Sequence, residues 1–319
     1  MKYSDTRAVV ETGFLTALIM VFTFIGLTVP AMGIFASILM PAVLVVLGAR
    51  HGIRWSILAT ITSGLVMSVV ITPFMAFMQV LTSGIPGLVL AYGYERRWST
   101  ARLLTLPAFT MMAMIAVQLG IAQYIMHVDL GQMWQQFQQE TMQSMEVAYR
   151  EQGLLEEQIQ PMVANMASLF KQMAYVAIAA LFMSSVIISY AICKVANVIV
   201  SRTGGKGVTL PPMEQWQVPQ WAVYIFALGI LLTYWGEQYQ SELINVIAYN
   251  LYALGTYMLV LQGVGCLWSI FKSYGLSTGF RLVLIFLTLI MNFATLWIGM
   301  LDLIFNLRRR LAKKSADEE

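Results

Sequence analysis

Long apolar stretches recur along the chain, and short polar segments separate them. The hydrocarbon core of a bilayer is about 30 Å thick, so a helix needs roughly 20 apolar residues to cross it. Nine stretches approach that length: 12–29, 33–48, 54–71, 74–93, 103–126, 172–200, 220–235, 243–271 and 281–307. Two of them, 33–48 and 220–235, are short. The pattern predicts an all-α, polytopic membrane bundle of eight or nine transmembrane helices.

The composition supports the same class of protein. Hydrophobic residues make up 59% of the chain and charged residues 11%, whereas soluble proteins have about 45–50% and 25%. So few charges cannot cover a soluble surface. The composition therefore excludes a cytosolic enzyme, a nucleic-acid-binding domain and a disulfide-stapled secreted domain, and it makes the lipid bilayer the first expected partner.

Basic residues mark one side of the predicted bundle. With the N-terminus inside, the inner loops hold twelve Lys and Arg residues, whereas the outer loops hold only Arg150 and Lys171. Lys and Arg are enriched in cytoplasmic loops, so we expect a bacterial inner-membrane protein with a cytoplasmic N-terminus. The five basic residues from Arg308 to Lys314 also favour the cytoplasm. Nine crossings would place them outside, so either a short segment such as 220–235 does not cross or the tail is exported.

Two polar segments divide the chain. The segment 127–171 is predicted to be an extracytoplasmic helical insertion within a six-helix membrane half, 1–200. The segment 201–219 is rich in Gly and Pro, and we expect it to be a cytoplasmic linker. It leads to a C-terminal membrane bundle, 220–319, which ends in the basic tail.

The insertion carries two apolar stripes with helical spacing, separated by Gly153 and Pro161. The stripes are Trp134, Phe137, Thr141, Met145 and Ala148, followed by Met162, Met166, Leu169 and Met173. They predict an amphipathic helix, a turn and a second helix that continues into the 172–200 span. Such a hairpin is either a lid over an outward-facing cavity or a pair of helices resting on the membrane interface.

Eight amides lie within the predicted spans: Gln79, Gln118, Gln123, Asn197, Asn245, Asn250, Gln262 and Asn292. Amides hydrogen-bond neutral ligands or neighbouring helices and do not transfer protons. The first four are candidate ligand-binding residues, with interhelical hydrogen bonds as the alternative. No HExxH motif, G-x-S-x-G motif or intramembrane pair of aspartates is present, so we expect neither an enzyme nor a cofactor.

One carboxylate, Asp302, lies well inside a predicted span. An ionisable residue at that depth is a functional candidate. Arg308 follows about 9 Å further along the helix axis, so the two residues form either a coupling or ligand site or an ion pair near the inner interface. The two cysteines and two histidines form no cluster, and we expect no metal site.

Gly13 and Ala17 are small residues four positions apart at the start of the first span. Such a pair lets a second helix approach closely. It is a candidate docking site for a membrane protein partner at the cytoplasmic face, where the basic loops also attract anionic lipid.

Short motifs follow one another in the C-terminal part: Pro211-Pro212-x-x-x-Trp216-x-Val218-Pro219-x-Trp221, Gln262-Gly263, Gly299-x-x-Asp302 and Arg308. With these motifs the chain resembles the YybS-like family of uncharacterised bacterial membrane proteins. The resemblance implies an architecture without an assigned reaction. It also implies genes located beside those for a cyclic-dinucleotide phosphodiesterase and for ribosomal proteins.

The first six spans, with Gly13 and Ala17 in the first and Pro41 to Gly48 ending the second, are similar to the substrate-capture (S) components of energy-coupling-factor vitamin transporters. That resemblance implies six helices with both ends cytoplasmic and a first helix that docks on a coupling protein. The chain departs from that family in having Gly rather than Ala at 13, in the 127–171 insertion and in the C-terminal bundle.

These observations favour a protein that binds, and as a further step imports, a small-molecule ligand without chemistry on it. The alternative is a non-transporting scaffold or accessory protein for envelope or cyclic-dinucleotide signalling partners. A transporter requires an enclosed cavity lined by several of the four candidate amides, whereas a scaffold would use those amides between helices.

Overall fold

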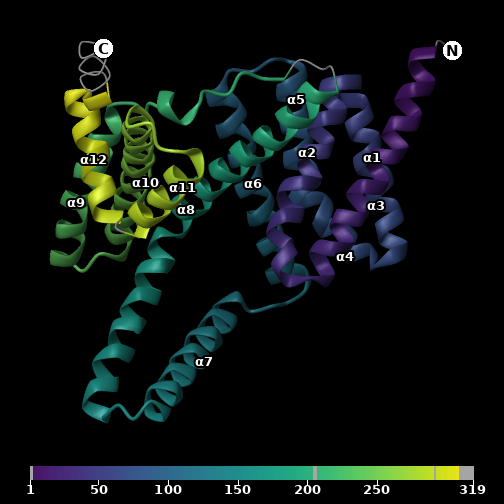
Figure 1. Ribbon diagram of the computed structural model, residues 1–319. Coiled ribbons are helices and arrows are strands. Elements are labelled where there is room, and N and C mark those ends of the chain that lie inside the picture. Colours follow the sequence, from purple (N-terminus) through teal and green to yellow (C-terminus); the bar gives the residue numbers. More distant parts are fainter. Residues whose placement is uncertain (1–2, 204–206, 291, 309–319) are drawn as a thin grey trace, which may run out of the picture. The chain divides into compact units, whose positions relative to one another are not determined.

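The computed structural model describes residues 3–203, 207–290 and 292–308, in which every regular element is helical (Figure 1). Seven helical runs there are long and apolar enough to cross a membrane. They are α1 (Tyr3–Thr28), α2 (Gly33–His51), α3 (Ile53–Val70), α4 to α5 (Pro73–Glu95), α6 with its last turn (Thr100–Ile125), α8 (Glu156–Arg202) and α10 (Glu242–Ser273). The prediction of an all-α, multi-pass membrane protein is confirmed.

The chain divides into two compact units. The N-terminal unit comprises Met1–Gln132 and Phe182–Leu210, and the C-terminal unit comprises Met133–Leu181 and Pro211–Glu319. The amino-acid pattern groups the insertion with the first half, whereas the structure groups most of it with the C-terminal bundle. Asn250 on α10 forms two hydrogen bonds with α8 just beyond the insertion: its amide nitrogen donates to the Tyr175 carbonyl (2.5 Å), and its oxygen accepts from the Ala179 N–H (2.9 Å).

Helix α2 lies at the centre of the N-terminal unit. All of its residues from 40 to 48 are buried, and it packs against α1, α3 and α5. Burial on every side explains why this short stretch is apolar all round. A Cβ added at Gly87 on α5 would lie only 3.1 Å from the Pro41 Cα, so the two helices are in close contact there.

One π-helical turn, η2 (Val80–Gly84), joins α4 (Pro73–Gln79) to α5 (Ile85–Glu95). Pro86 has no N–H group to donate to the carbonyl four residues earlier. The Ile85 amide instead donates to the Val80 carbonyl five residues back. A proline therefore accounts for the break in the helix.

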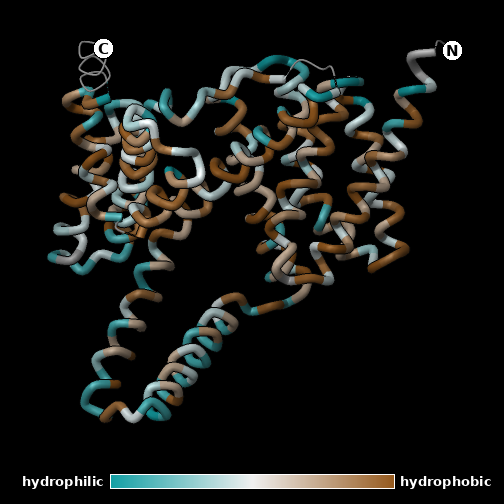
Figure 2. Tube along the Cα trace, in the orientation of Figure 1, coloured by the Kyte–Doolittle hydropathy of each residue, from teal (hydrophilic) through white to brown (hydrophobic). Residues whose placement is uncertain are grey.

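Within the C-terminal unit, most of α7 (Leu130–Glu151) lies along the first part of α8. Trp134 and Phe137 stack on each other, and both make edge contacts with Phe170 of α8. Polar and apolar residues alternate along both helices (Figure 2). Within residues 156–173 of α8 the buried positions are Ile159 and Phe170, whereas the predicted stripe residues Met162, Leu169 and Met173 are exposed.

Helix α9 (Trp221–Gln238) and α10 form an antiparallel hairpin. Gly229 lies against the backbone of Tyr252, and Gly255 lies against the backbone of Phe226. Helix α12 (Asn292–Phe305) contacts α10 equally closely, because Gly299 lies against the Leu259 carbonyl. Glycines thus permit the tight helix packing that is typical of membrane bundles.

The last apolar stretch, 281–307, is not one straight helix as the pattern predicts. It comprises α11 (Thr278–Ile290) and α12, whose axes differ by 104°. Glu214 lies before α9. Its carboxylate forms an ion pair with Lys272 at the end of α10, and its backbone carbonyl accepts a hydrogen bond from Arg308 after α12 (3.0 Å). The ends of α10 and α12 therefore lie at the same end of this unit. The basic tail beyond Arg308 and linker residues 204–206 lie outside the described residues.

Candidate functional site

Asn197, on α8, holds the linker. Its side-chain oxygen accepts from the Val208 N–H (3.0 Å), and its nitrogen donates to the Val208 carbonyl (2.7 Å). The Tyr94 hydroxyl on α5 lies 3.2 Å from the same oxygen. Gly207 permits the approach, because a Cβ there would lie 2.7 Å from the Asn197 oxygen. Asn197 thus fixes the linker to the N-terminal unit.

Two other candidate amides lie away from any shared cavity among the described residues. Gln118 on α6 (Thr100–Gly120) donates to the Thr82 hydroxyl in the π-helical turn (2.8 Å). Gln123, in the π-helical turn η3 (Ile121–Ile125) after α6, is exposed. The structure therefore does not bring the four candidate amides together.

Gln79 lines a small cavity in the N-terminal unit, which we call the hydroxyl cavity. Four hydroxyl side chains line it too: Thr23 of α1, Thr60 and Ser63 of α3, and Ser83 of η2. Its volume is about 20 Å³, room for about one water molecule. Sequence reasoning missed these hydroxyls. Their spacing in the sequence could have indicated them, because Thr60 and Ser63 are three residues apart and share a helix face.

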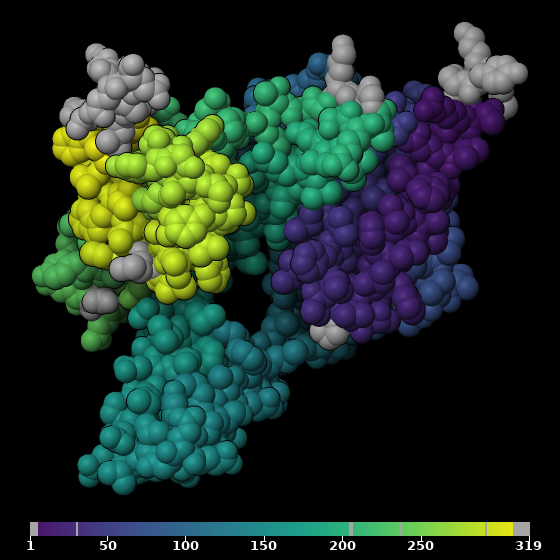
Figure 3. Space-filling view, in the orientation of Figure 1, coloured from purple at the N-terminus to yellow at the C-terminus, as the bar shows by residue number. Residues whose placement is uncertain are grey.

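Gly13 and Ala17 lie on the outward face of α1. A Cβ added at Gly13 would meet no other atom within 4 Å. The opposite face, with Thr16 and Ile19, is buried against the unit. In the space-filling view the side chains of α1, in dark purple, form part of the surface (Figure 3). We call Gly13 and Ala17 the α1 notch.

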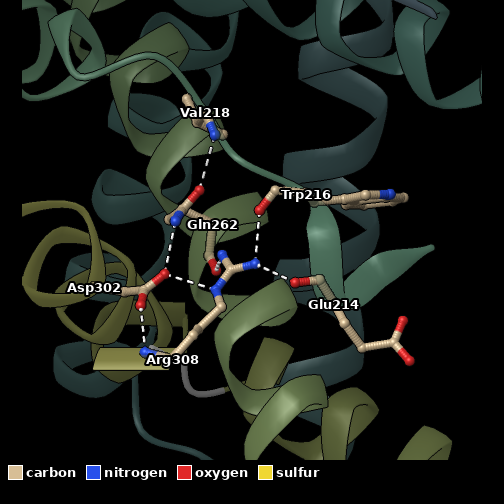
Figure 4. A network of polar contacts seen from close by, with 6 residues as sticks. All are labelled: Glu214, Trp216, Val218, Gln262, Asp302 and Arg308. Atoms are coloured by element: carbon tan, nitrogen blue, oxygen red, sulfur yellow. Dashed lines mark hydrogen bonds and ion pairs between the residues drawn. The ribbon is translucent and has the colours of Figure 1, made fainter. Parts of the chain in front are cut away.

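A buried polar network occupies the C-terminal unit (Figure 4). The Asp302 carboxylate is 3% exposed. One oxygen accepts from Arg308 Nε (2.7 Å) and Gln262 Nε2 (2.6 Å), and the other accepts from the Arg308 backbone N–H (3.1 Å). The structure therefore places Asp302 and Arg308 in a direct, hydrogen-bonded ion pair.

The network also binds the chain segment before α9. Arg308 donates to the carbonyls of Glu214 (3.0 Å) and Trp216 (2.7 Å), and Gln262 accepts from the Val218 N–H (2.9 Å). Both charges are neutralised, and their hydrogen-bonding groups have protein partners. The network thus fastens 214–218 to α10 and α12, which the charge pattern alone did not indicate.

An ion pair supports this attachment at the surface. Lys272 donates a 2.6 Å hydrogen bond to the Glu214 carboxylate. That bond lowers the pKa of Glu214 from its ordinary value of 4.5. Elsewhere in the described residues, no three His, Cys, Asp or Glu side chains gather closely enough to hold a metal ion.

The helices and their apolar surfaces define a polytopic α-helical membrane protein. A family model described as "Predicted membrane protein (DUF2232)" matches residues 17–304, and the chain belongs to that family. The match does not bear on the resemblance to YybS-like proteins or to S components. No match was found among curated proteins or among solved structures.

Proposed function

We propose that this protein is a non-transporting membrane scaffold or accessory protein that docks a helical membrane partner against the α1 notch. The observation that carries the proposal is the position of Gly13 and Ala17 on an outward face with open space over Gly13. The excess of Lys and Arg in the predicted inner loops supports a cytoplasmic position for this end of α1, as part of the proposal.

The chemistry of the surface favours a helix over lipid as the occupant. Val10 and Phe14 beside the notch are 68% and 69% exposed. Lipid chains gain nothing from a small residue between large apolar ones, whereas a helix approaching at a small residue makes extensive van der Waals contact. The resemblance to S components, which dock through this part of their first helix, supports the same surface.

The positions of the candidate amides also support this function. Gln118 and Asn197 are engaged by Thr82 and by the linker, as expected if amides connect parts of the bundle. Because these two amides are already hydrogen-bonded within the protein, the apolar outer surface of α1 is the stronger candidate for binding a partner.

The test compares two double variants with the same spacing of small residues. Gly13→Leu/Ala17→Leu fills the notch, whereas Ala116→Leu/Gly120→Leu fills a second pair of small residues on α6, where Gly120 is partly exposed and a Cβ added to it would also meet no atom within 4 Å. We expect only the first to lose its co-purifying membrane partner, by at least tenfold, with membrane insertion unchanged. Equal retention by both variants would remove the docking proposal.

Binding and import of a small molecule by the N-terminal unit is a second candidate. Gln79 and four hydroxyls line one cavity in a membrane-spanning bundle, but the cavity has room for about one water molecule, so this candidate requires the unit to open on binding. Its test is the unfolding temperature of the purified protein with vitamins, nucleosides and cyclic dinucleotides. We expect a true ligand to raise it in the unaltered protein and not in Gln79→Leu, and a screen without any such rise would count against import.

A further inference from the structure

The first part of α8 continues a helix that is fixed within the membrane bundle. Helix α8 runs without interruption from Glu156 through Ala179, and Tyr175 and Ala179 are hydrogen-bonded to Asn250 of the spanning helix α10. Glu156 lies about 28 Å along the helix axis from Tyr175, and this part of α8 extends away from α9 and α10 (Figure 1). A straight helix held beside α10 cannot also lie flat on the bilayer surface, so this part faces water.

An apolar stripe on this water-facing segment is largely uncovered in the described chain. Leu155, Met162 and Leu169 follow one another at intervals of seven residues, and each is 40% to 68% exposed. Residues seven apart lie on the same side of a helix. The contact with α7 uses another side of α8, on which Ile159 and Phe170 are buried.

Amides alternate with these apolar residues on the same side of α8. Gln158, Asn165 and Gln172 are also seven residues apart, and all three are exposed. The Gln158 oxygen accepts from the Leu155 N–H (3.2 Å), whereas Asn165 and Gln172 make no side-chain hydrogen bond within the described residues. The alternating spacing of three and four residues is that of a coiled-coil seam. We call these six residues the α8 seam: Leu155, Gln158, Met162, Asn165, Leu169 and Gln172.

We propose that the α8 seam binds the α8 seam of a second copy of this chain, in a parallel contact of two helices. Two copies in one membrane have the same orientation, so a two-fold axis along the membrane normal places each seam residue opposite itself. Apolar residues then meet apolar residues. An amide carries both donors and an acceptor, so each amide can hydrogen-bond its own counterpart.

The distribution of charge favours this side of the hairpin and a second copy as its occupant. The seam itself contains no charged residue, and Glu156, Glu157 and Lys171 lie on other sides of α8 by helix geometry. Helix α7 carries the acids Glu140, Glu146 and Glu151, which would oppose like charges if two copies met there. The seam is therefore the side on which identical hairpins approach without repulsion.

The test is disulfide crosslinking in isolated membranes treated with copper phenanthroline. Asn165→Cys places a thiol in the seam. Ala167→Cys is the matched control, because it is also exposed, lies at nearly the same height and is turned by about 200° around the helix. We expect at least ten times more covalent homodimer from Asn165→Cys than from Ala167→Cys. The native Cys193 and Cys266 are buried and do not contribute.

A second substitution tests the seam itself. Met162→Glu combined with Asn165→Cys should reduce the homodimer at least tenfold, because two carboxylates would then face each other. Ala164→Glu, on another side of α8, should leave it unchanged. Equal homodimer from positions 165 and 167, no homodimer from position 165, or a crosslink from position 165 to a different protein would overturn the proposal. All of these positions are exposed, and the result does not depend on docking at the α1 notch.

Discussion

Gln262 donates a 2.6 Å hydrogen bond to the Asp302 carboxylate, and thereby joins the middle of α10 to α12. Arg308 completes the network on the same carboxylate oxygen. A buried charge is tolerated when an opposite charge and hydrogen bonds replace its lost hydration. The network therefore explains how an aspartate inside an apolar helix is compatible with a stable fold.

Removing one charge of this network should strongly destabilise the protein. Asp302→Ala leaves Arg308 unpaired in a largely buried position, and we expect a loss of about 3–5 kcal/mol in the free energy of unfolding. Denaturant titration in detergent micelles measures it. The exposed acid Glu140 supplies the control, because Glu140→Ala should change stability by less than about 0.5 kcal/mol. A similar cost for both variants would show that the network contributes little.

Close helix packing predicts a sharp difference between two glycines. A Cβ at Gly299 would clash with the Leu259 carbonyl, whereas Gly279 on α11 has open space. Gly299→Ala should cost about 1–3 kcal/mol through overpacking, and Gly279→Ala should be neutral or slightly stabilising. Thermal unfolding of the two variants in one detergent tests this. A stable Gly299→Ala variant would contradict the packing of α10 and α12.

The Glu214–Lys272 pair predicts a defined pH dependence. The pKa of Glu214 is lowered by the Lys272 hydrogen bond, so its stabilisation is fully present above 4.5, the ordinary value, and is lost as the pH falls through the lowered value. The unfolding temperature of the unaltered protein should therefore exceed that of Glu214→Gln at neutral pH. The two should converge on acidification below about pH 4.5. Lys272→Met should abolish the difference, and a difference that grows in acid would contradict the assignment.

The same contacts predict the side of the C-terminus. Helices α9 and α10 leave the linker end and return to it, and Arg308 after α12 is again at that end. A cysteine replacing Ser315 should therefore react with an impermeant reagent only after lysis, whereas one replacing Gln143 on α7 should react in intact cells. The native Cys193 and Cys266 are buried and provide a silent background. Labelling of position 315 in intact cells would contradict this topology.

Sequence alone predicted the helical class well, because a transmembrane helix is specified by local apolar length. It did not predict the bend between α11 and α12, since an apolar run carries no information about direction. On α8 it favoured the Met162 stripe, whereas the aromatic contacts of Trp134 select Phe170. Neighbouring stripes on one helix differ by a single position, and only tertiary packing distinguishes them.

The candidate sites also differ in whether the sequence could predict them. The pair Asp302 and Arg308 was visible because charges are rare within apolar runs. The hydroxyl cavity was not, since Thr and Ser are common in membrane helices and only the fold brings Thr23 beside Thr60. Asn197 was predicted as a candidate ligand-binding amide, and its sequence context did not indicate that it also bonds a linker residue 11 positions away.

Docking at the α1 notch is tested most directly by photocrosslinking in intact cells, with a photoreactive amino acid in place of Ala17. Val69 on α3, which is 86% exposed, is the matched position on another outward face. We predict one protein adduct of defined mass from position 17, absent from position 69 and lost when Gly13→Leu is added. Equal adducts from both positions, or an adduct that persists with Gly13→Leu, would contradict docking at the notch.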